Sequence, residues 1–346
     1  EYALIKDENF QLLVPKHDEE YLKKRKYFNS INELIENYQK IFEIYNGMAG
    51  LDNSTPENKK IKNRYFLKAD IHGAGGAYYG TYWTANSTKT TDMWLNGGNE
   101  WGTLHEIGHG YQTGFDSRGM YTGEVSNNLF AAQFQYTTLG KIADRKGWLL
   151  DYGNAKNVDN NLYTELIEKN KSYQSLSDLR LQLVILAMMK QKATNEAFIE
   201  LYKGYRKDAN EPEFNNSNYY LQDLINKYYS EYSKFDFTGI LKRLGTIIRD
   251  KNQIIYNRSK GYPAVAFLAD VVPKDKLKDA RDVIDKKYMV NTNFQVIDNS
   301  EIKELNLKGN LSVHINTKSI NDLINKKILL KDGKKVVQEK IITGEN

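Results

Sequence analysis

The sequence predicts an α+β fold, with a small sheet and helices first, a mainly helical region next, and a strand-rich unit at the end. Three observations support this order. Apolar residues recur at helical spacing through residues 31–45 and again between about residues 162 and 244. Aromatic and β-prone stretches fill residues 64–95. After residue 288, apolar and polar residues alternate around hairpin-type turn signals.

The N-terminal part, residues 1–60, is predicted to be helical. Ser30 followed by Glu33 matches a capping box, which starts a helix by satisfying its free N–H groups. The apolar residues that follow at helical spacing are Ile31, Leu34, Ile35, Tyr38, Ile41, Phe42 and Tyr45. Gly47 is placed to end this helix. The polar stretch 52–63 is typical of a linker.

Residues 61–140 are predicted to hold a small sheet and two helices. The stretches 65–67 and 77–84 are aromatic and β-prone, and a glycine-rich turn separates them, so we place two strands here. A helix is expected over about residues 100–113, and a second over about residues 123–139.

Residues 141–260 are predicted to form a helical subdomain, and residues 261–346 a β-rich accessory domain, with the boundary located only to within tens of residues. Two residues placed to cap successive helices of the subdomain are Ser177 and Thr194. In the accessory domain, Gly309-Asn310 and Asp332-Gly333 each lie between apolar stretches. Such dipeptides indicate hairpin turns.

The charge and cysteine counts exclude several classes of function. The net charge of +5 comes from 49 basic and 44 acidic residues that are interspersed, which gives little support for nucleic-acid binding. The absence of cysteine excludes disulfides, thiolate metal sites and cysteine nucleophiles. It fits a bacterial exported protein, although a cytosolic protein can lack cysteine too.

The apolar runs of the chain are short, and its first residue is not a start methionine. No stretch approaches the roughly 18–20 apolar residues that span a bilayer. The chain begins at Glu1 without a signal peptide. We therefore expect a processed segment of a secreted or cell-surface protein, with its targeting signal lost.

The segment Trp101-Gly-Thr-Leu-His105-Glu106-Ile-Gly-His109-Gly predicts a metal site. Positions i and i+4 of a helix share one face, so His105 and His109 can direct two imidazoles at one Zn²⁺. Glu106 follows the first of these ligands, where its carboxylate can reach a water instead of the metal. The pattern is the one expected of a metallopeptidase.

The alternative is a helix with two histidines on a solvated face, and two glycines count against it. Gly108 and Gly110 would each cost up to about 1 kcal/mol in a helix. Close packing or the approach of a substrate is a better reason for their presence.

A catalytic zinc takes three protein ligands, so a third must lie elsewhere. An extended signature with a third histidine is excluded, because that position holds Phe115. The other histidines are isolated: His17, His72 and His314. A carboxylate is then expected, and Glu124, 15 residues after His109, is the best candidate. Its other explanation is a favourable charge in the first turn of a helix. Asp116, only seven residues after His109, competes but has little room to fold back.

The run His-Glu-Ile-Gly-His-Gly-Tyr-Gln at residues 105–112, followed by Gly-Glu-Val-Ser-Asn-Asn at 123–128, resembles the M60 (enhancin-like) metallopeptidases. The resemblance is specific over about residues 94–130, extends plausibly over residues 1–260, and does not reach the C-terminal unit. It implies a zincin-like catalytic domain, secretion, and activity on mucins or related O-glycoproteins, often with a sugar beside the scissile bond.

Carried over residue by residue, the resemblance implies that His105, His109 and Glu124 bind zinc and that Glu106 is the catalytic base. Family members often have an aromatic residue ahead of the zinc helix that contacts the glycan, and Trp94 fits that place. The chain departs from the family where Gly110 stands in place of a frequent asparagine.

The predicted function is hydrolysis of peptide bonds in mucin-like O-glycoproteins by a zinc-activated water, with Glu106 as general base. Candidates for a substrate-binding group that stabilises the oxyanion are Tyr111, Tyr121 and Arg180. The glycine-rich stretch 73–80 lacks the lysine and serine of a phosphate loop, so it is expected to bring an edge strand to the cleft.

Two alternatives stay open. One is a zinc peptidase that acts on unglycosylated protein. The other is a non-catalytic glycan- or mucin-binding protein, against which the intact Glu106 counts, because a structural zinc site is closed by four ligands and needs no base. The expected partner is a glycoprotein or mucin substrate, and the sequence leaves the oligomeric state open.

Overall fold

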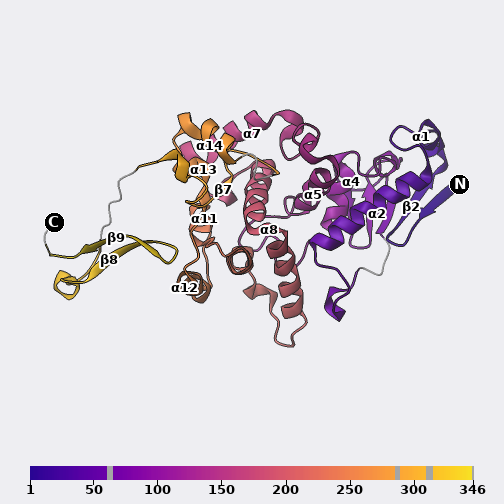
Figure 1. The fold of residues 1–346 in the computed structure, drawn as a ribbon. Helices are drawn as coiled ribbons and strands as arrows, with labels where there is room; N and C mark the ends of the chain where they lie inside the picture. The colour runs from indigo at the N-terminus through magenta and orange to yellow at the C-terminus, as the bar shows by residue number, and fades with distance from the viewer. Residues whose placement is uncertain (61–64, 285–288, 309–314, 345–346) are drawn as a thin grey trace.

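The structure of the protein is a computed structural model that describes residues 1–60, 65–284, 289–308 and 315–344 (Figure 1). The fold is mixed α+β, as predicted. In Figure 1 the N-terminal sheet lies at one end of the molecule, helices fill its centre, and a two-stranded hairpin lies at the other end. Among the described residues, no helix is both long enough and apolar enough to cross a bilayer.

The N-terminal sheet has five strands in the order β1-β2-β3-β5-β4. Strand β2 is antiparallel to β1, β3 is parallel to β2 and β5, and β4 is antiparallel to β5. The strands are β1 (Tyr2–Lys6), β2 (Phe10–Pro15), β3 (Tyr65–Ala69), β4 (Ala77–Tyr79) and β5 (Trp83–Asn86). Strand β4 is therefore an edge strand, and it contacts the helix that carries the two histidines.

The prediction of a helical N-terminal part is wrong for its first residues, which form β1 and β2. Phe10, Leu12 and Val14 alternate along β2 and are buried on one face of the sheet. A period of two is the strand pattern, and the helical spacing begins only later. The predicted strand 77–84 is likewise two strands, because the chain turns at Gly80, whose N–H donates to Trp83 O at 2.7 Å.

Helix α2 (Ile31–Met48) confirms the predicted capping box. The Ser30 hydroxyl accepts a hydrogen bond from Glu33 N–H at 3.1 Å. The helix packs on the sheet, and its Tyr38 ring stacks on Phe10 with 4.4 Å between ring centroids. Because the buried Tyr45 hydroxyl donates to Leu104 O at 2.9 Å, α2 also fixes the position of the next helices.

Three helices follow the sheet: α3 (Asp92–Leu95), α4 (Trp101–His109) and α5 (Asn127–Leu139). Helix α1 (Glu19–Lys24) lies before them in the sequence and contacts α3. Both predicted helices over 100–113 and 123–139 exist, but α4 ends earlier and α5 begins later than expected. The residues between them form a tight loop held by side chains, which helical spacing alone does not reveal.

The elements named between residues 143 and 260 are all helices, joined by loops. The long helix α8 follows the cap Asp178, one residue after the predicted Ser177, and the carboxylate accepts from Arg180 N–H at 2.9 Å. At Thr194 the backbone leaves helical geometry, so this residue separates two helical segments as predicted. The helices are α6 (Ala143–Lys146), α7 (Ala155–Leu162), α8 (Leu179–Ala209), α9 (Leu221–Leu224), α10 (Ser230–Ser233), α11 (Thr238–Arg243) and α12 (Lys251–Lys260).

The β-rich unit predicted over residues 261–346 is not confirmed, because its described residues mix helices with short strands. Its elements are β6 (Ala266–Phe267), α13 (Leu268–Val271), α14 (Leu277–Ile284), β7 (Val296–Ile297), β8 (Lys327–Asp332) and β9 (Lys335–Ile341). The hairpin predicted at Asp332-Gly333 is confirmed by the pairing of β8 with β9. The hairpin turn predicted at Gly309-Asn310 lies outside the described residues. The boundary near residue 260 stays a prediction.

Candidate metal centre

Three candidate ligand atoms come together at the C-terminal half of α4. His105 and His109 are one turn apart on α4, and their Nε2 atoms lie 3.2 Å from each other. Glu124 lies in the turn just before α5. Its Oε2 is 3.1 Å from His105 Nε2 and 3.3 Å from His109 Nε2. The three atoms therefore form a nearly equilateral triangle.

This triangle fits a tetrahedral zinc ion. Zinc bonds of about 2.0–2.1 Å at tetrahedral angles place neighbouring donor atoms about 3.3–3.4 Å apart. The donors are two imidazoles and one carboxylate, a set that catalytic zinc uses. The Glu124 side chain is 51% exposed, so the site is open to solvent on one side. Within the described residues, this is the one group of His, Asp and Glu that could hold a metal.

Both glycines of the motif allow close packing. A Cβ on Gly108 would lie 2.5 Å from the backbone oxygen of Asn127, so the glycine lets the start of α5 approach α4. A Cβ on Gly110 would lie 1.6 Å from the hydroxyl of Tyr65 on β3. A side chain at Gly108 would push the start of α5 away from α4, and one at Gly110 would displace the Tyr65 hydroxyl. Close packing, the predicted reason for these glycines, therefore holds at both positions.

Asp116, the competing third ligand, instead holds the loop between α4 and α5. Its carboxylate accepts hydrogen bonds from Thr113 N–H at 2.7 Å, the Thr122 hydroxyl at 3.0 Å and the Ser126 hydroxyl at 2.5 Å. Burial raises the pKa of Asp116, and these hydrogen bonds partly offset the increase. The loop that carries Glu124 is thus tied at both ends by one buried carboxyl group.

Each ligand histidine contacts the side-chain amide of a neighbour through Nδ1. His109 Nδ1 lies 2.8 Å from Gln112 Oε1, and His105 Nδ1 lies 2.8 Å from Asn128 Oδ1. Burial lowers the pKa of His105, and the hydrogen bond with Asn128 opposes this. The sequence did not predict these two amides, although Asn128 is part of the motif that resembles the family. Asn128 could have been predicted from this motif, because histidines that bind a metal regularly form a hydrogen bond through their other ring nitrogen.

Glu106 is buried beside the first ligand. Its Oε2 has no hydrogen-bond partner among the described residues. Burial raises the pKa of Glu106 to about 7, and the nearby Glu124 carboxylate adds to the increase. A buried carboxyl group without a protein partner is unusual in a structural role, because buried polar groups are otherwise paired. Its position suits a group that takes and releases a proton.

Two of the predicted substrate-binding residues belong to the core instead. Trp94 is 0% exposed, and its indole N–H donates to Lys68 O at 2.8 Å. Tyr111 is buried, and its hydroxyl donates to Asn46 Oδ1 at 3.0 Å. The sheet and α2 cover both rings, so neither can contact a substrate in this structure. The prediction of a glycan-contacting Trp94 is therefore corrected.

The two other candidates are partly exposed. Tyr121 is partly exposed, and its hydroxyl lies 3.2 Å from where a Cβ on Gly123 would be, next to the Glu124 turn. Arg180 stacks over Trp148, 4.4 Å from its ring, and pairs with Asp151 at 3.1 Å.

Arg180 reaches the ligand helix through a stack of aromatic rings. Trp148 packs on Trp101 with 4.9 Å between ring centroids, and both tryptophans are partly exposed. Trp101 is one helical turn before His105 and so shares its face of α4. These two tryptophans are residues that the sequence reasoning missed as part of the site, although Trp101 begins the motif itself.

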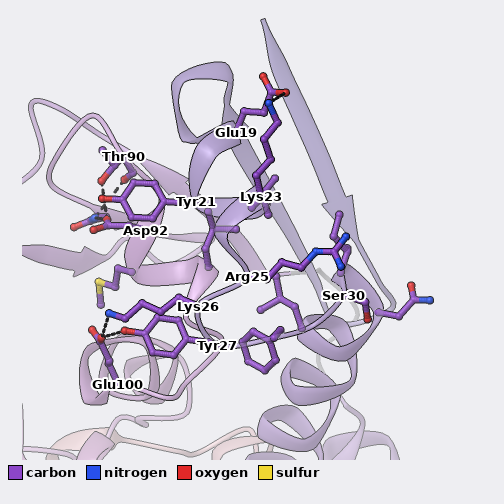
Figure 2. A pocket seen from close by; sticks show the side chains of 18 of the residues that line it. Glu19, Tyr21, Lys23, Arg25, Lys26, Tyr27, Ser30, Thr90, Asp92 and Glu100 are labelled. Atoms are coloured by element: carbon purple, nitrogen blue, oxygen red, sulfur yellow. Dashed lines mark hydrogen bonds and ion pairs between the residues drawn. The ribbon is translucent and has the colours of Figure 1, made fainter.

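A cavity of about 1100 Å³ lies at the other end of α4, beside α1 and α3 (Figure 2). In Figure 2 the Tyr21 ring points toward Thr90 and Asp92, and the Tyr27 ring points toward Glu100, with which its hydroxyl bonds. Charges of both signs line the cavity. The candidate metal ligands are not among the described residues that line it, so it is separate from the metal centre.

Comparison with known sequences gives a family match. Residues 1–238 match the family model of "Peptidase M60, enhancin and enhancin-like". The viral-enhancing factor of Heliothis armigera granulosis virus is 33% identical over 114 residues, which cover 32% of this chain and 12% of that protein. The factor of Trichoplusia ni granulosis virus is 32% identical over 118 residues, 33% of this chain and 13% of that protein.

Solved structures show a similar fold. A conserved Bacillus anthracis protein of unknown function has a TM-score of 0.58 at 18% identity, covering 76% of this chain and 52% of its own. The M60 catalytic domain of Clostridium perfringens ZmpC, solved in complex with the sialyl T antigen, has a TM-score of 0.55 at 20% identity, with 75% and 48% covered. The chain thus spans about half the length of these structures.

Proposed function

The chain belongs to the peptidase M60, enhancin and enhancin-like family, and from that premise we propose that it is a secreted or cell-surface bacterial zinc metallopeptidase that cleaves mucin-like O-glycoproteins. One observation carries the proposal. Three donor atoms of His105, His109 and Glu124 lie 3.1–3.3 Å apart beside the buried, unpaired carboxyl group of Glu106. Three ligands with an adjacent base are the parts of a catalytic zinc site.

The four residues have two different roles in the proposed mechanism. His105 Nε2, His109 Nε2 and Glu124 Oε2 would hold the ion. Zinc, when bound, supplies a Lewis acid that acidifies water and polarises the scissile carbonyl. Glu106 accepts the proton of the attacking water on a carboxylate oxygen and then donates it to the leaving amide nitrogen. Its buried position keeps competing water away from that proton.

The proposal for a glycosylated substrate has two supports. The first is the sialyl T antigen bound to the ZmpC domain, whose fold this chain shares. The second is the stack of Trp101, Trp148 and Arg180, which offers a partly exposed aromatic surface one turn from His105. Rings of this kind pack against the apolar faces of sugars and peptides alike. This stack takes the place of the buried Trp94 in the proposal.

The first test is cleavage of one mucin-type peptide, offered with and without its O-linked sugar and followed by mass spectrometry. We expect cleavage of the glycosylated form alone, its loss with a zinc chelator, and its return when zinc is added back. The return separates metal loss from denaturation by the chelator. No cleavage of either form by zinc-loaded protein would contradict the proposed activity.

The second candidate is a zinc peptidase for unglycosylated protein, and edge strand β4 favours it. This strand contacts α4 and has one free edge, where an extended peptide can add as a further strand through backbone hydrogen bonds alone. Such binding requires no sugar. Equal cleavage of both forms of the test peptide would establish this candidate and leave the aromatic stack without a glycan role.

A further inference from the structure

We infer that Gln112 is a positioning residue that couples two of the three metal ligands: it fixes the tautomer of His109 and holds the turn that carries Glu124. The inference rests on the proposed zinc site. Gln112 follows α4 and points back at the second ligand of the same helix. Its side chain also reaches forward to the loop before α5. One amide thus contacts both parts of the site.

The orientation of the Gln112 amide is set by its partners. Its Nε2 lies 3.1 Å from Thr122 O, 2.8 Å from Gly123 O and 2.8 Å from the Ser126 hydroxyl. Backbone carbonyls only accept hydrogen bonds, so the NH₂ group must face them. The amide oxygen Oε1 is then the atom that faces His109 Nδ1, at 2.8 Å.

This orientation determines the proton on His109. An amide oxygen only accepts, so Nδ1 must carry the hydrogen and Nε2 must keep its lone pair. That is the tautomer a metal ligand needs at Nε2. A competing acceptor is present, because Glu124 Oε2 lies 3.3 Å from the same Nε2. Asn127 Nδ2, a donor whose orientation is set by its bond to His105 O, also lies 3.2 Å from this Nε2 and favours the lone pair there. Without Gln112, Nδ1–H loses its acceptor, and the Glu124 carboxylate would raise the share of His109 that carries its proton on Nε2.

The same amide holds the third ligand. Thr122 and Gly123 immediately precede Glu124, and both of their carbonyls accept from Gln112. A parallel contact exists at the first ligand, where Asn128 Oδ1 faces His105 Nδ1 and Asn128 Nδ2 donates to Glu124 O at 2.9 Å. Asn128 Nδ2 has one acceptor in the turn, whereas the two hydrogens of the Gln112 NH₂ group are shared among three acceptors around it. Gln112 is therefore the stronger link between a histidine and the turn.

The alternative is that Gln112 only holds the turn and has no effect on His109. The chain offers a matched control for this alternative. Gln182 is buried, and its Nε2 donates to Tyr173 O and Leu176 O, each at 3.1 Å. This amide also ties a turn through two carbonyls but contacts no histidine. Gln182→Met therefore removes a comparable clamp without altering a metal ligand.

The test uses the full chain, labelled with ¹⁵N-histidine, in metal-free form at pH 8, where free imidazole is neutral. With five histidines in the chain, each ring is assigned by substituting it. We expect His109 to carry its proton on Nδ1 in the natural protein and in Gln182→Met. In Gln112→Met a measurable share of the proton moves to Nε2, although the Asn127 donor beside Nε2 opposes this shift. Gln112→Glu keeps an acceptor for Nδ1–H, and so keeps the tautomer, but loses the hydrogen bonds that the NH₂ group donates to the turn.

The second readout is zinc affinity, measured by competition with a coloured chelator. We expect the zinc Kd to rise about 10- to 100-fold in Gln112→Met, the usual effect of losing a partner of a ligand histidine, and to stay within about twofold in Gln182→Met. An unchanged tautomer and Kd in Gln112→Met, or an equal loss of affinity in Gln182→Met, would overturn the inference.

The natural protein gives an independent check that needs no variant. Finding the His109 proton on Nε2 in that protein would also overturn the inference, even if Gln112→Met did not fold. A chain that binds zinc as expected but cleaves no peptide would count against the proposed function alone, because neither readout depends on catalysis. A chain that binds no zinc would end the proposed function, and the tautomer would still decide the role of Gln112.

Discussion

At the scale of single residues, two carboxyl groups of the candidate site differ in their surroundings, and this difference supports the separate roles proposed for them. Glu124 is half exposed, and its Oε2 lies against both histidine Nε2 atoms. Glu106 is buried and its Oε2 contacts no donor among the described residues. A ligand must face the other ligands, and a base must be free to take a proton. Neighbouring carboxyl groups in unlike environments commonly divide acid–base work in this way.

Glu106→Gln is expected to abolish most hydrolysis and leave zinc bound. The amide has nearly the same shape but cannot accept the proton of the water, and general-base catalysis contributes about 10²- to 10⁴-fold in rate. The measurements are kcat/KM on the glycosylated peptide and zinc content by elemental analysis. Glu124→Ala is the counterpart and should lose stoichiometric zinc. Activity near the natural level in Glu106→Gln would contradict the assigned role.

The residues of the metal centre could be predicted because their relation is local. The i, i+4 spacing of His105 and His109 is a constant of the helix, and Glu124 is a better-placed carboxylate along the chain than its competitor Asp116. The role of Trp94 could not be predicted in this way. Its burial depends on β3 and α2, which come from distant parts of the sequence. The residue types in a segment and their spacing do not indicate whether distant elements will bury a side chain.

At the scale of elements, the site depends on how closely α4 and α5 approach. Gly108→Ala is expected to lower the free energy of unfolding by about 1–3 kcal/mol, since the added Cβ would lie 2.5 Å from Asn127 O and overpacking costs about that much. Zinc affinity should fall as well, because the start of α5 moves away from the ligands. Urea denaturation of the metal-free protein and zinc titration measure the two effects.

The control is Gly47→Ala near the end of α2, where a Cβ would meet nothing within 4 Å. This change should raise the free energy of unfolding by up to about 1 kcal/mol, the helix propensity difference between the two residues. Equal stability of Gly108→Ala and the natural protein would show that α5 can move without cost.

Helices α8 and α5 meet at a buried lysine, which predicts how stability varies with pH. Lys190 Nζ donates to Gln133 Oε1 at 2.9 Å, and burial lowers the pKa of Lys190 to about 8. Between pH 8 and the usual lysine pKa near 10.5, the unfolded chain binds this proton and the folded chain does not. The free energy of unfolding therefore rises with pH in that window, by at most about 1.4 kcal/mol per unit.

Lys190→Met should remove this dependence. The stability of the natural protein relative to the variant is expected to increase from pH 8 to 9.5 and to be flat below pH 7. Urea denaturation of both proteins at each pH gives the difference, in which the ionisation of buried tyrosines at higher pH cancels. A difference that does not change with pH would show that the amine stays ionised in the folded protein.

The sequence predicted best those elements that depend on a few neighbouring residues. The capping box of α2 and the turn of the β8–β9 hairpin depend on a few neighbouring residues, and both are present. Strands β1 and β2 were missed, because β2 gains its stability from β3 and α2, beyond its own short alternation of Phe10, Leu12 and Val14. Sheet pairing over long distances leaves little trace in a single segment.

At the scale of the whole molecule, the region after residue 260 shares a core with the helices before it. Phe267 on β6 and Phe294 before β7 are buried in contact with each other, and β7 packs on α8. A buried ion cluster adds to this connection. Lys192 Nζ on α8 lies 2.7 Å from Asp298 and 2.5 Å from Glu301. All three side chains are less than 10% exposed.

These contacts predict where the chain can be shortened. Ending the chain at residue 260 removes the acidic partners of Lys192 together with the buried Phe267 and Phe294, and it exposes the apolar surface that this region covers, which costs about 25 cal/mol per Å². Because small domains are stable by only about 5–15 kcal/mol, we expect the 1–260 fragment to be unfolded or aggregated. The 1–308 fragment keeps the cluster and should fold and bind zinc.

Circular dichroism melting and zinc titration show which of the two fragments folds and binds zinc. If the 1–260 fragment folds, binds zinc and melts near the temperature of the full chain, the domain boundary predicted near residue 260 is correct, and the shared core contributes little. If only the 1–308 fragment folds, the catalytic unit extends to about residue 308. The β8–β9 hairpin, whose strands are mostly exposed, is then a separate part of the molecule that the metal centre does not require.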